Sequence, residues 1–438
     1  MNQKTIGKYR WTICALIFFA TTINYIDRNV ISFLKSTFTT ELGWTDGDYA
    51  NIEIAFKIFY SLGMLGAGRI IDKLGTRVGY GLYTFLWSLA GVATALANSV
   101  FGFGIVRSFL GLAEAGNFPA AIKSVAEWFP KKERALATGI FNSGANIGAI
   151  VTPILVPMIL INWGWHWAFI STGLLGFVWL IFWMLFYEIP RKSKYAGAAE
   201  IEYIESDKEI VDDVVVKDPT YTWAQLLTYK QTWAFVIGKF LTDPIWWFYL
   251  FWLPDYFESV FHSKLEAASW PVATVYIIST VGSIGGGWIP LWLIKRGTPV
   301  FKARKMSMLV YAFFVIPIVF ALILGKMNMW YAVGVIGLAA AAHQAWSANI
   351  FTTVSDMFPK GATGSVTGIG GMAGGLGGIA LSLFVQKQMF VYYRSIGHIE
   401  TAYYIMFAIC ASAYLLAWVI MHFLVPRMKP ITGGTPGV

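Results

Sequence analysis

The sequence predicts an all-α membrane protein with about twelve transmembrane helices in two bundles of about six. The chain has 438 residues, of which 57% are hydrophobic and only 13% are charged, whereas soluble domains have about 25% charged residues. The hydrophobic residues form continuous runs, and at roughly 20 residues per span these runs supply about twelve helices. Continuous rather than alternating runs exclude an outer-membrane barrel. We therefore expect a polytopic helical protein in a lipid bilayer.

A charged segment divides the predicted helices into two sets. It extends from Glu188 to roughly Lys230 and is rich in acidic residues, namely Glu200, Glu202, Glu205, Asp207, Glu209, Asp212 and Asp213. We predict an N-terminal helical bundle over residues 1–188, a cytoplasmic linker over 189–230 and a C-terminal helical bundle over 231–438.

The net charge of +9 at pH 7 suggests a nucleic-acid partner, but the positions of the basic residues favour a membrane explanation. Lysines and arginines gather before the first predicted helix and in the loops after the second, fourth, sixth, eighth and twelfth helices. Loops rich in Lys and Arg remain in the cytoplasm. We expect both termini to be cytoplasmic and no nucleic acid to be bound.

The two cysteines, Cys14 and Cys410, fall inside predicted helices near opposite ends of the chain. They are expected to be free thiols, without a disulfide framework, a metal site or a cofactor. The basic N-terminus leads into a full-length apolar helix without a small-residue cleavage site, so we interpret this segment as the first helix rather than a signal peptide.

The stretch Phe101–Trp128 is long enough for one membrane helix, yet it contains Arg107 and Glu114. Their spacing of seven residues (114 − 107) makes two helical turns, so both side chains project from one face. A charge at the bilayer centre costs at least about 2.5–3.5 kcal/mol, so such a residue is expected to face water or an opposite charge. We predict that this face forms the wall of a polar pocket.

Four other predicted helices also carry polar side chains that lipid would not accommodate. They are Tyr25, Asp27 and Arg28 in Trp11–Phe33; Glu53, Lys57 and Tyr60 in Asp48–Ile71; Lys239 and Asp243 in Trp233–Phe257; and His343, Gln344 and Asn349 in the tenth helix. Glu53 with Lys57, and Lys239 with Asp243, are spaced i, i+4, so each pair can neutralise itself. For Glu53 and Lys57 we favour the self-neutralising ion pair. For Lys239 we favour a contact with the substrate, and an ion pair with Asp243 is the equally weighted alternative.

The sequence contains an internal repeat. Glu127–Lys131 resembles Asp356–Lys360 at an offset of 229 residues (356 − 127), and the offset persists without a gap to Ile150 and Ile379. Transporters built from duplicated bundles place their binding site at the midplane between the repeats. The same register pairs Glu114 with His343, so each half places a titratable residue at one helical position.

The chain resembles the major facilitator superfamily. Gly68–Arg77 fits its signature in the loop between the second and third helices. Tyr25–Arg28, Arg107–Glu114 and Trp128–Arg134 resemble the anion:cation symporter group, and Gly238–Pro244 and Ala342–Ala345 look most like its bacterial hexuronate carriers. The resemblance implies two helical bundles with alternating access in a bacterial inner membrane. Two positions depart from the galactonate carriers of this group: Gly371 and Ala145 stand near positions where those carriers have amides. Lys57 also departs from the expected pattern, because a small or neutral residue is expected at its position.

A proton-coupled anion carrier needs a fixed cation for the substrate carboxylate and a carboxylate that binds protons. Arg28 and Arg107 suit the first task, because guanidinium binds carboxylate through two parallel hydrogen bonds. Asp27 and Glu114 suit the second, because an anionic substrate that takes away their arginine partner increases their affinity for a proton. The alternative interpretation is that these four residues form structural ion pairs between two helices.

The remaining candidate residues fall into two groups. Further candidate substrate contacts are Tyr25, Tyr60, His343, Gln344 and Asn349, with His343 favoured as a hydrogen-bonding residue over a proton carrier. Within Trp246–Tyr249, consecutive residues fan around the helix, so at most two can face the pocket and one is expected to stack on a sugar. A cytoplasmic gate is predicted from Asp72, Arg77, Glu127 and Arg134.

We therefore predict a monomeric alternating-access transporter that imports a sugar acid, such as glucuronate or galacturonate, together with protons. One alternative is a carrier of aldonates or other organic anions, with sodium or exchange coupling. A nutrient sensor is disfavoured by the short tails, and an enzyme by the absence of His-Glu-x-x-His, Gly-x-Ser-x-Gly and phosphate-loop motifs.

Overall fold

The computed structural model is helical in all of its regular elements and describes residues 7–44, 46–206, 221–261, 265–427 and 430–431. No strand occurs in these ranges. The acidic residues predicted at 207, 209, 212 and 213 lie outside the described residues.

In the described residues up to 188, the first half comprises eight α-helices. They are α1 (Tyr9–Phe33), α2 (Lys35–Glu41), α3 (Asp46–Leu74), α4 (Thr76–Thr94), α5 (Val100–Glu114), α6 (Asn117–Trp128), α7 (Lys131–Trp163) and α8 (Trp165–Phe186). The described parts of the connection to the second half (189–206 and 221–229) contain three short helices: η1 (Pro190–Lys192), α9 (Ala198–Glu205) and α10 (Trp223–Thr228).

The second half continues with helical elements of 5 to 32 residues. They are α11 (Lys230–Phe261), α12 (Leu265–Lys295), α13 (Val300–Val315), η2 (Ile316–Phe320), α14 (Ala321–Met327), α15 (Met329–Met357), α16 (Lys360–Ala380), η3 (Leu381–Gln386), α17 (Lys387–Ser395) and α18 (Ile399–Leu424). When consecutive pieces are joined into spans, the order matches a twelve-helix membrane fold.

Seven of the described helical segments are long and apolar enough to cross a membrane on length and composition alone. Several of the others have evident reasons for a weaker signal. α5 and α6 have only 15 and 12 residues, and α11 contains both Lys239 and Asp243. The charges that identify a polar pocket therefore also reduce the hydropathy of the helices that carry them.

The fourth predicted span differs from the continuous helix expected over 101–128. It is divided into α5 and α6 at Ala115–Gly116. Here the backbone of Gly116 lies so close to the Tyr83 ring that a Cβ atom would be 2.1 Å from Cγ of that ring. Glu114 consequently lies at the last position of α5 instead of in mid-helix.

Both copies of the predicted repeat adopt the same local structure. Phe129 directly follows α6 and Phe358 directly follows α15, both in extended conformation. Pro130 and Pro359 then precede α7 and α16 with ψ near 150°. The repeat therefore reflects a helix–corner–helix unit that occurs once in each half.

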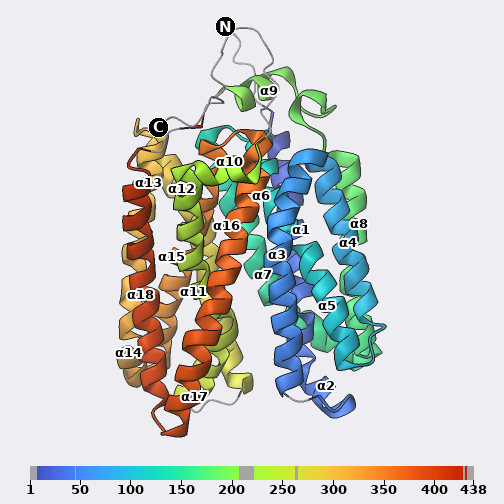
Figure 1. The fold of residues 1–438 in the computed structure, drawn as a ribbon, viewed down its shortest axis with the longest axis vertical. Helices are drawn as coiled ribbons and strands as arrows, with labels where there is room; N and C mark the ends of the chain where they lie inside the picture. The colour runs from blue at the N-terminus through green and yellow to red at the C-terminus, as the bar shows by residue number, and fades with distance from the viewer. Residues whose placement is uncertain (1–6, 45, 207–220, 262–264, 428–429, 432–438) are drawn as a thin grey trace.

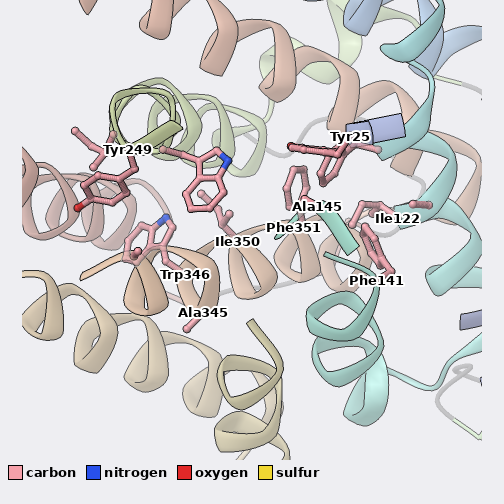
Figure 2. Packing of buried hydrophobic residues seen from close by; sticks show 14 of the residues in the cluster. Tyr25, Ile122, Phe141, Ala145, Tyr249, Ala345, Trp346, Ile350 and Phe351 are labelled. Carbon is pink, nitrogen blue, oxygen red and sulfur yellow. The ribbon is translucent and has the colours of Figure 1, made fainter. Parts of the chain in front are cut away.

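The two halves stand side by side, with the described ends of the chain and α9 at one end of the molecule (Figure 1). We call this end the terminal face; it contains Tyr9, Pro130 and Val425. Across the interface, α3 packs along α16 and α7 along α12. Buried aromatic and aliphatic residues of both halves approach each other there, including Tyr25 and Phe141 from the first half and Phe351 from the second (Figure 2).

The halves are in close contact near the terminal face. A Cβ atom on Gly68 of α3 would lie 2.1 Å from the carbonyl oxygen of Gly364 on α16. Beside this contact, Asp72 accepts hydrogen bonds from the Ser365 backbone N–H at 2.7 Å and the Ser365 hydroxyl at 2.6 Å. Ser283 Oγ of α12 donates to the Gly139 carbonyl of α7 at 2.8 Å.

Replacing Gly68 with valine should open this contact. Overpacking costs about 1–3 kcal/mol, so the closed arrangement should become less populated by about 5- to 150-fold. The measurement is the rate of maleimide labelling of a Ser283→Cys reporter, since the native Cys14 and Cys410 are both buried. Gly66→Val is the matched control, because a Cβ atom at Gly66 would meet nothing within 4 Å. Equal labelling rates in both variants would contradict this interpretation.

Candidate functional site

A cavity lies between the halves, on the far side of the terminal-face contacts. Its empty volume is about 970 Å³, with the part open to solvent included. The first half contributes side chains from α1, α3, α6 and α7. The second half contributes side chains from α11 and α15 and the backbone of α16 at Gly371 and Gly375. Each half therefore forms one wall.

The cavity face of α1 follows from helical spacing. Tyr25, Arg28, Asn29 and Ser32 line the cavity at positions i, i+3, i+4 and i+7, which share one face of a helix. Asp27 is rotated by about 100° from Arg28 and is not among the lining residues. Its carboxyl group lies beside Gly91 of α4 and Thr172 of α8. The predicted pocket position of Asp27 is therefore not observed in this arrangement, and its role in proton coupling remains a prediction.

Arg28 forms an ion pair with Glu114, the pair that the electrostatic hypothesis requires. Arg28 Nε donates to Glu114 Oε2 at 2.8 Å, and its Nη2 donates to Asn24 Oδ1 at 3.2 Å. The guanidinium lies 4.6 Å from the ring centroid of Tyr25 and 4.7 Å from that of Tyr60. The Arg28 side chain is 15% exposed while Glu114 is fully buried. The Arg28 guanidinium therefore faces the cavity, whereas Glu114, which was predicted to form part of the cavity wall, is not among its lining residues and lies behind Arg28.

Arg107 has a different position from the one predicted. Its side chain is fully buried and does not line the cavity. Nη2 donates to the Arg28 carbonyl at 2.8 Å and lies 3.8 Å from Glu53 Oε1. Arg107 therefore supports the α1 backbone beneath Arg28, while Glu53 and Lys57, 3.9 Å apart, both line the cavity.

The second wall is dominated by α11. Lys239, Asp243, Trp246, Trp247 and Leu250 line the cavity from one helical face. Lys239 Nζ lies 2.7 Å from Asp243 Oδ2. This confirms that the i, i+4 ion pair forms, and both of its members also line the cavity.

Two aromatic residues of the run Trp246–Tyr249 face the cavity, as helical fanning predicts. Trp246 and Trp247 line it, whereas Phe248 and Tyr249 are fully buried in the second half. The Trp246 ring stacks on His343 with a centroid distance of 5.1 Å and an interplanar angle of 4°.

The predicted polar residues of α15 do not all reach the cavity. His343 lines it, and its Nδ1 is 2.5 Å from the Tyr414 hydroxyl. Gln344 also lines the cavity and contacts two amides of α7: Asn142 donates to it at 2.7 Å, and it donates to Asn146 at 3.2 Å. Asn349 instead donates to the Gly286 and Ala345 carbonyls and is buried away from the cavity. A direct sugar contact from Asn349 is therefore not supported.

The four predicted gate residues are divided between two environments. Asp72 bonds Ser365 across the interface and pairs with Lys123 at 3.0 Å within its own half. Arg134 reaches the second half by donating to the Ser355 carbonyl and pairing with Asp356 at 3.6 Å.

Arg77 and Glu127 have side-chain partners within the first half. Arg77 pairs with Glu188 at 2.6 Å, and Glu127 accepts from Thr76 at 2.8 Å and Tyr187 at 2.5 Å. Of the four predicted gate residues, Asp72 and Arg134 therefore make the side-chain contacts between the halves that a gate would use.

Sequence reasoning missed one charged pair and one amide at the interface. Arg304 of α13, fully buried, pairs with Asp356 at 3.1 Å and donates to the Lys131 carbonyl of the first half at 2.8 Å. Asp356 belongs to the repeated motif, which was a usable signal, whereas Arg304 had none. The amide is Asn142 of α7, which donates to Gln344 at the cavity.

Comparisons with known proteins agree with this architecture. The chain is 32% identical over 386 residues to the hexuronate transporter of Escherichia coli strain K12, which covers 87% of this chain and 88% of that protein. It is 33% identical over 286 residues to the galacturonate transporter of Dickeya chrysanthemi, covering 65% of this chain and 83% of that protein. It is 29% identical to the D-galactonate transporter of Escherichia coli O6:H1, covering 88% of this chain and 90% of that protein.

Solved structures show the same fold. The proton:xylose symporter XylE bound to 6-bromo-6-deoxy-D-glucose superposes with a TM-score of 0.74 at 16% identity, covering 96% of this chain and 97% of that one. Residues 17–382 match the family described as Major Facilitator Superfamily. The sequence match, the shared fold and the cavity between two helical halves together lead to one conclusion: this multi-pass membrane protein belongs to the Major Facilitator Superfamily.

Proposed function

We propose that this transporter imports a hexuronate, such as glucuronate or galacturonate, together with protons. The family and its curated relatives are transporters and not enzymes. The observation that carries the proposal is the 2.8 Å pair between Arg28 and Glu114, in which the cation faces the cavity and the carboxylate is buried behind it.

The pair provides a mechanism for coupling. A substrate carboxylate that forms two hydrogen bonds with the Arg28 guanidinium competes with Glu114 for the same donors. A buried carboxylate that loses its cation partner is costly to keep ionised, so Glu114 then takes up a proton. Substrate and proton therefore bind together, and lower pH strengthens substrate binding.

The closed terminal face supports an assignment of conformational state. We propose that it is cytoplasmic, because lysines and arginines concentrate in its loops, and that the cavity receives substrate from the outside. The contacts of Asp72 and Arg134 must then break for release into the cytoplasm of a bacterial cell. Because both walls of the cavity come from one chain, a monomer is sufficient.

The test is uptake of labelled glucuronate into proteoliposomes, with and without an imposed pH gradient. The proposal predicts accumulation only when the outside is acidic, and no requirement for sodium. Accumulation driven by a sodium gradient instead, or uptake of galactonate without glucuronate, would favour the alternative carrier of aldonates or other organic anions. The similarity of this chain to a D-galactonate transporter is the observation that supports this alternative.

A further inference from the structure

In the ion pair of Lys239 and Asp243, the carboxylate is more exposed to the cavity than the ammonium group is. The side chain of Asp243 is 19% exposed and that of Lys239 only 6%. The Lys239 ammonium lies 4.0 Å from the ring centroid of Phe351, which covers it. A ligand that enters the cavity therefore meets an acceptor of hydrogen bonds at this point of α11.

The charge of Asp243 does not oppose an anionic ligand, because Lys239 neutralises it at 2.7 Å. An ionised carboxylate has two oxygens with about four acceptor positions and no donor. Lys239 occupies one of these positions, and the others remain for donors. The donors that an anionic sugar offers are its hydroxyl groups.

The backbone of α16 packs directly against this carboxylate. A Cβ atom on Gly374 would lie 2.1 Å from Asp243 Oδ2, so this position of the carboxylate depends on a glycine at residue 374. One helical turn further along α11, Trp246 offers an aromatic ring that lines the same cavity and is supported from behind by His343. An acceptor and a flat apolar surface one turn apart suit a polyhydroxylated ring.

We infer that Asp243 recognises the hydroxyl groups of the substrate and makes the cavity select sugar acids over organic anions that lack hydroxyls. This inference rests on the proposed function, since it assigns the carboxylate end of the substrate to Arg28 in the opposite wall. The substrate then bridges the halves, with its charge on α1 and its hydroxyls on α11. Sites built to bond a hydroxyl reject analogues without it, because their own polar group is left unpaired.

The experiment measures the Kd of glucuronate and of tetrahydropyran-2-carboxylate, which keeps the ring and the carboxylate but has no hydroxyls. Binding is followed through tryptophan fluorescence in purified wild type and Asp243→Asn. We expect the wild type to prefer glucuronate. In Asp243→Asn, the Kd of glucuronate should rise about 10- to 150-fold, as for loss of hydrogen bonds to a charged group, while that of the analogue should not rise.

A second variant tests the same inference with the carboxylate retained. Gly374→Ala should displace Asp243 and reduce the preference for glucuronate, whereas Gly378→Ala is the matched control, since its Cβ atom would lie at an ordinary 3.6 Å from the Trp247 ring. Glu400→Gln, in an exposed 2.7 Å pair with Lys326, controls for loss of any carboxylate in the second half.

The outcomes separate the two proposals. Equal affinity of the wild type for both ligands, or an equal loss for both ligands in Asp243→Asn, would overturn the role of Asp243 and leave hexuronate transport standing. Absence of glucuronate binding and uptake in the wild type would overturn the proposed function and this inference with it.

Discussion

Replacing Arg28 with methionine should raise the Kd of glucuronate by at least about 30-fold. Loss of one partner from a buried, hydrogen-bonded charge pair costs about 2–5 kcal/mol or more, and Arg28 is the cation that faces the cavity at the Glu114 pair. Arg28→Lys should show an intermediate loss, because it keeps the charge but cannot form the bidentate contact. The measurement is titration with glucuronate followed by tryptophan fluorescence, to which Trp246 and Trp247 in the cavity should contribute.

Two controls keep this prediction specific. Arg28→Met leaves Glu114 without its cation, so the double variant Arg28→Met with Glu114→Gln removes both charges and tests binding in a neutral site. Arg191→Met removes an arginine from an exposed 2.7 Å pair with Glu205, outside the cavity, and should bind as the wild type does. Wild-type affinity in the double variant would refute the role of Arg28.

Glu114→Gln should abolish accumulation of glucuronate driven by a pH gradient while exchange of internal for external substrate remains measurable. The amide cannot release or take up a proton, so the gradient has no group on which to act. Accumulation and counterflow are measured in the same proteoliposomes. Glu205→Gln, which removes a carboxylate at the terminal face, is the control. Unchanged accumulation in Glu114→Gln would show that the coupling group lies elsewhere.

The sequence correctly predicted the features that depend only on which side of one helix a residue occupies. The face with Tyr25 and Arg28, the pairing of Lys239 with Asp243, and the limit of two cavity-facing aromatics in Trp246–Tyr249 all follow from 3.6 residues per turn. Membrane insertion costs also indicated correctly that these helices border a polar space. The repeat located the equivalent corners at Pro130 and Pro359.

The sequence did not reveal how each helix is rotated relative to its neighbours. Asp27 and Arg28 are adjacent, yet one faces α4 and α8 and the other the cavity. Arg107 shares a face with Glu114 but reaches the α1 carbonyls instead of the cavity, and Asn349 turns to Gly286. The side chains of Arg77 and Glu127 form their ion pair and hydrogen bond with residues of the first half, to which they themselves belong. Such choices depend on contacts between segments far apart in the chain, which local periodicity does not encode.

The most direct test of the account is the number of protons taken up when glucuronate binds to the purified protein. Binding is initiated in a weakly buffered solution, and the pH change is recorded with an indicator dye for the wild type and Glu114→Gln. If the substrate carboxylate displaces Glu114 from Arg28, the wild type should take up protons on binding and the variant should take up measurably fewer. Saturating glucuronate binding without proton uptake, or equal uptake in both proteins, would contradict the account.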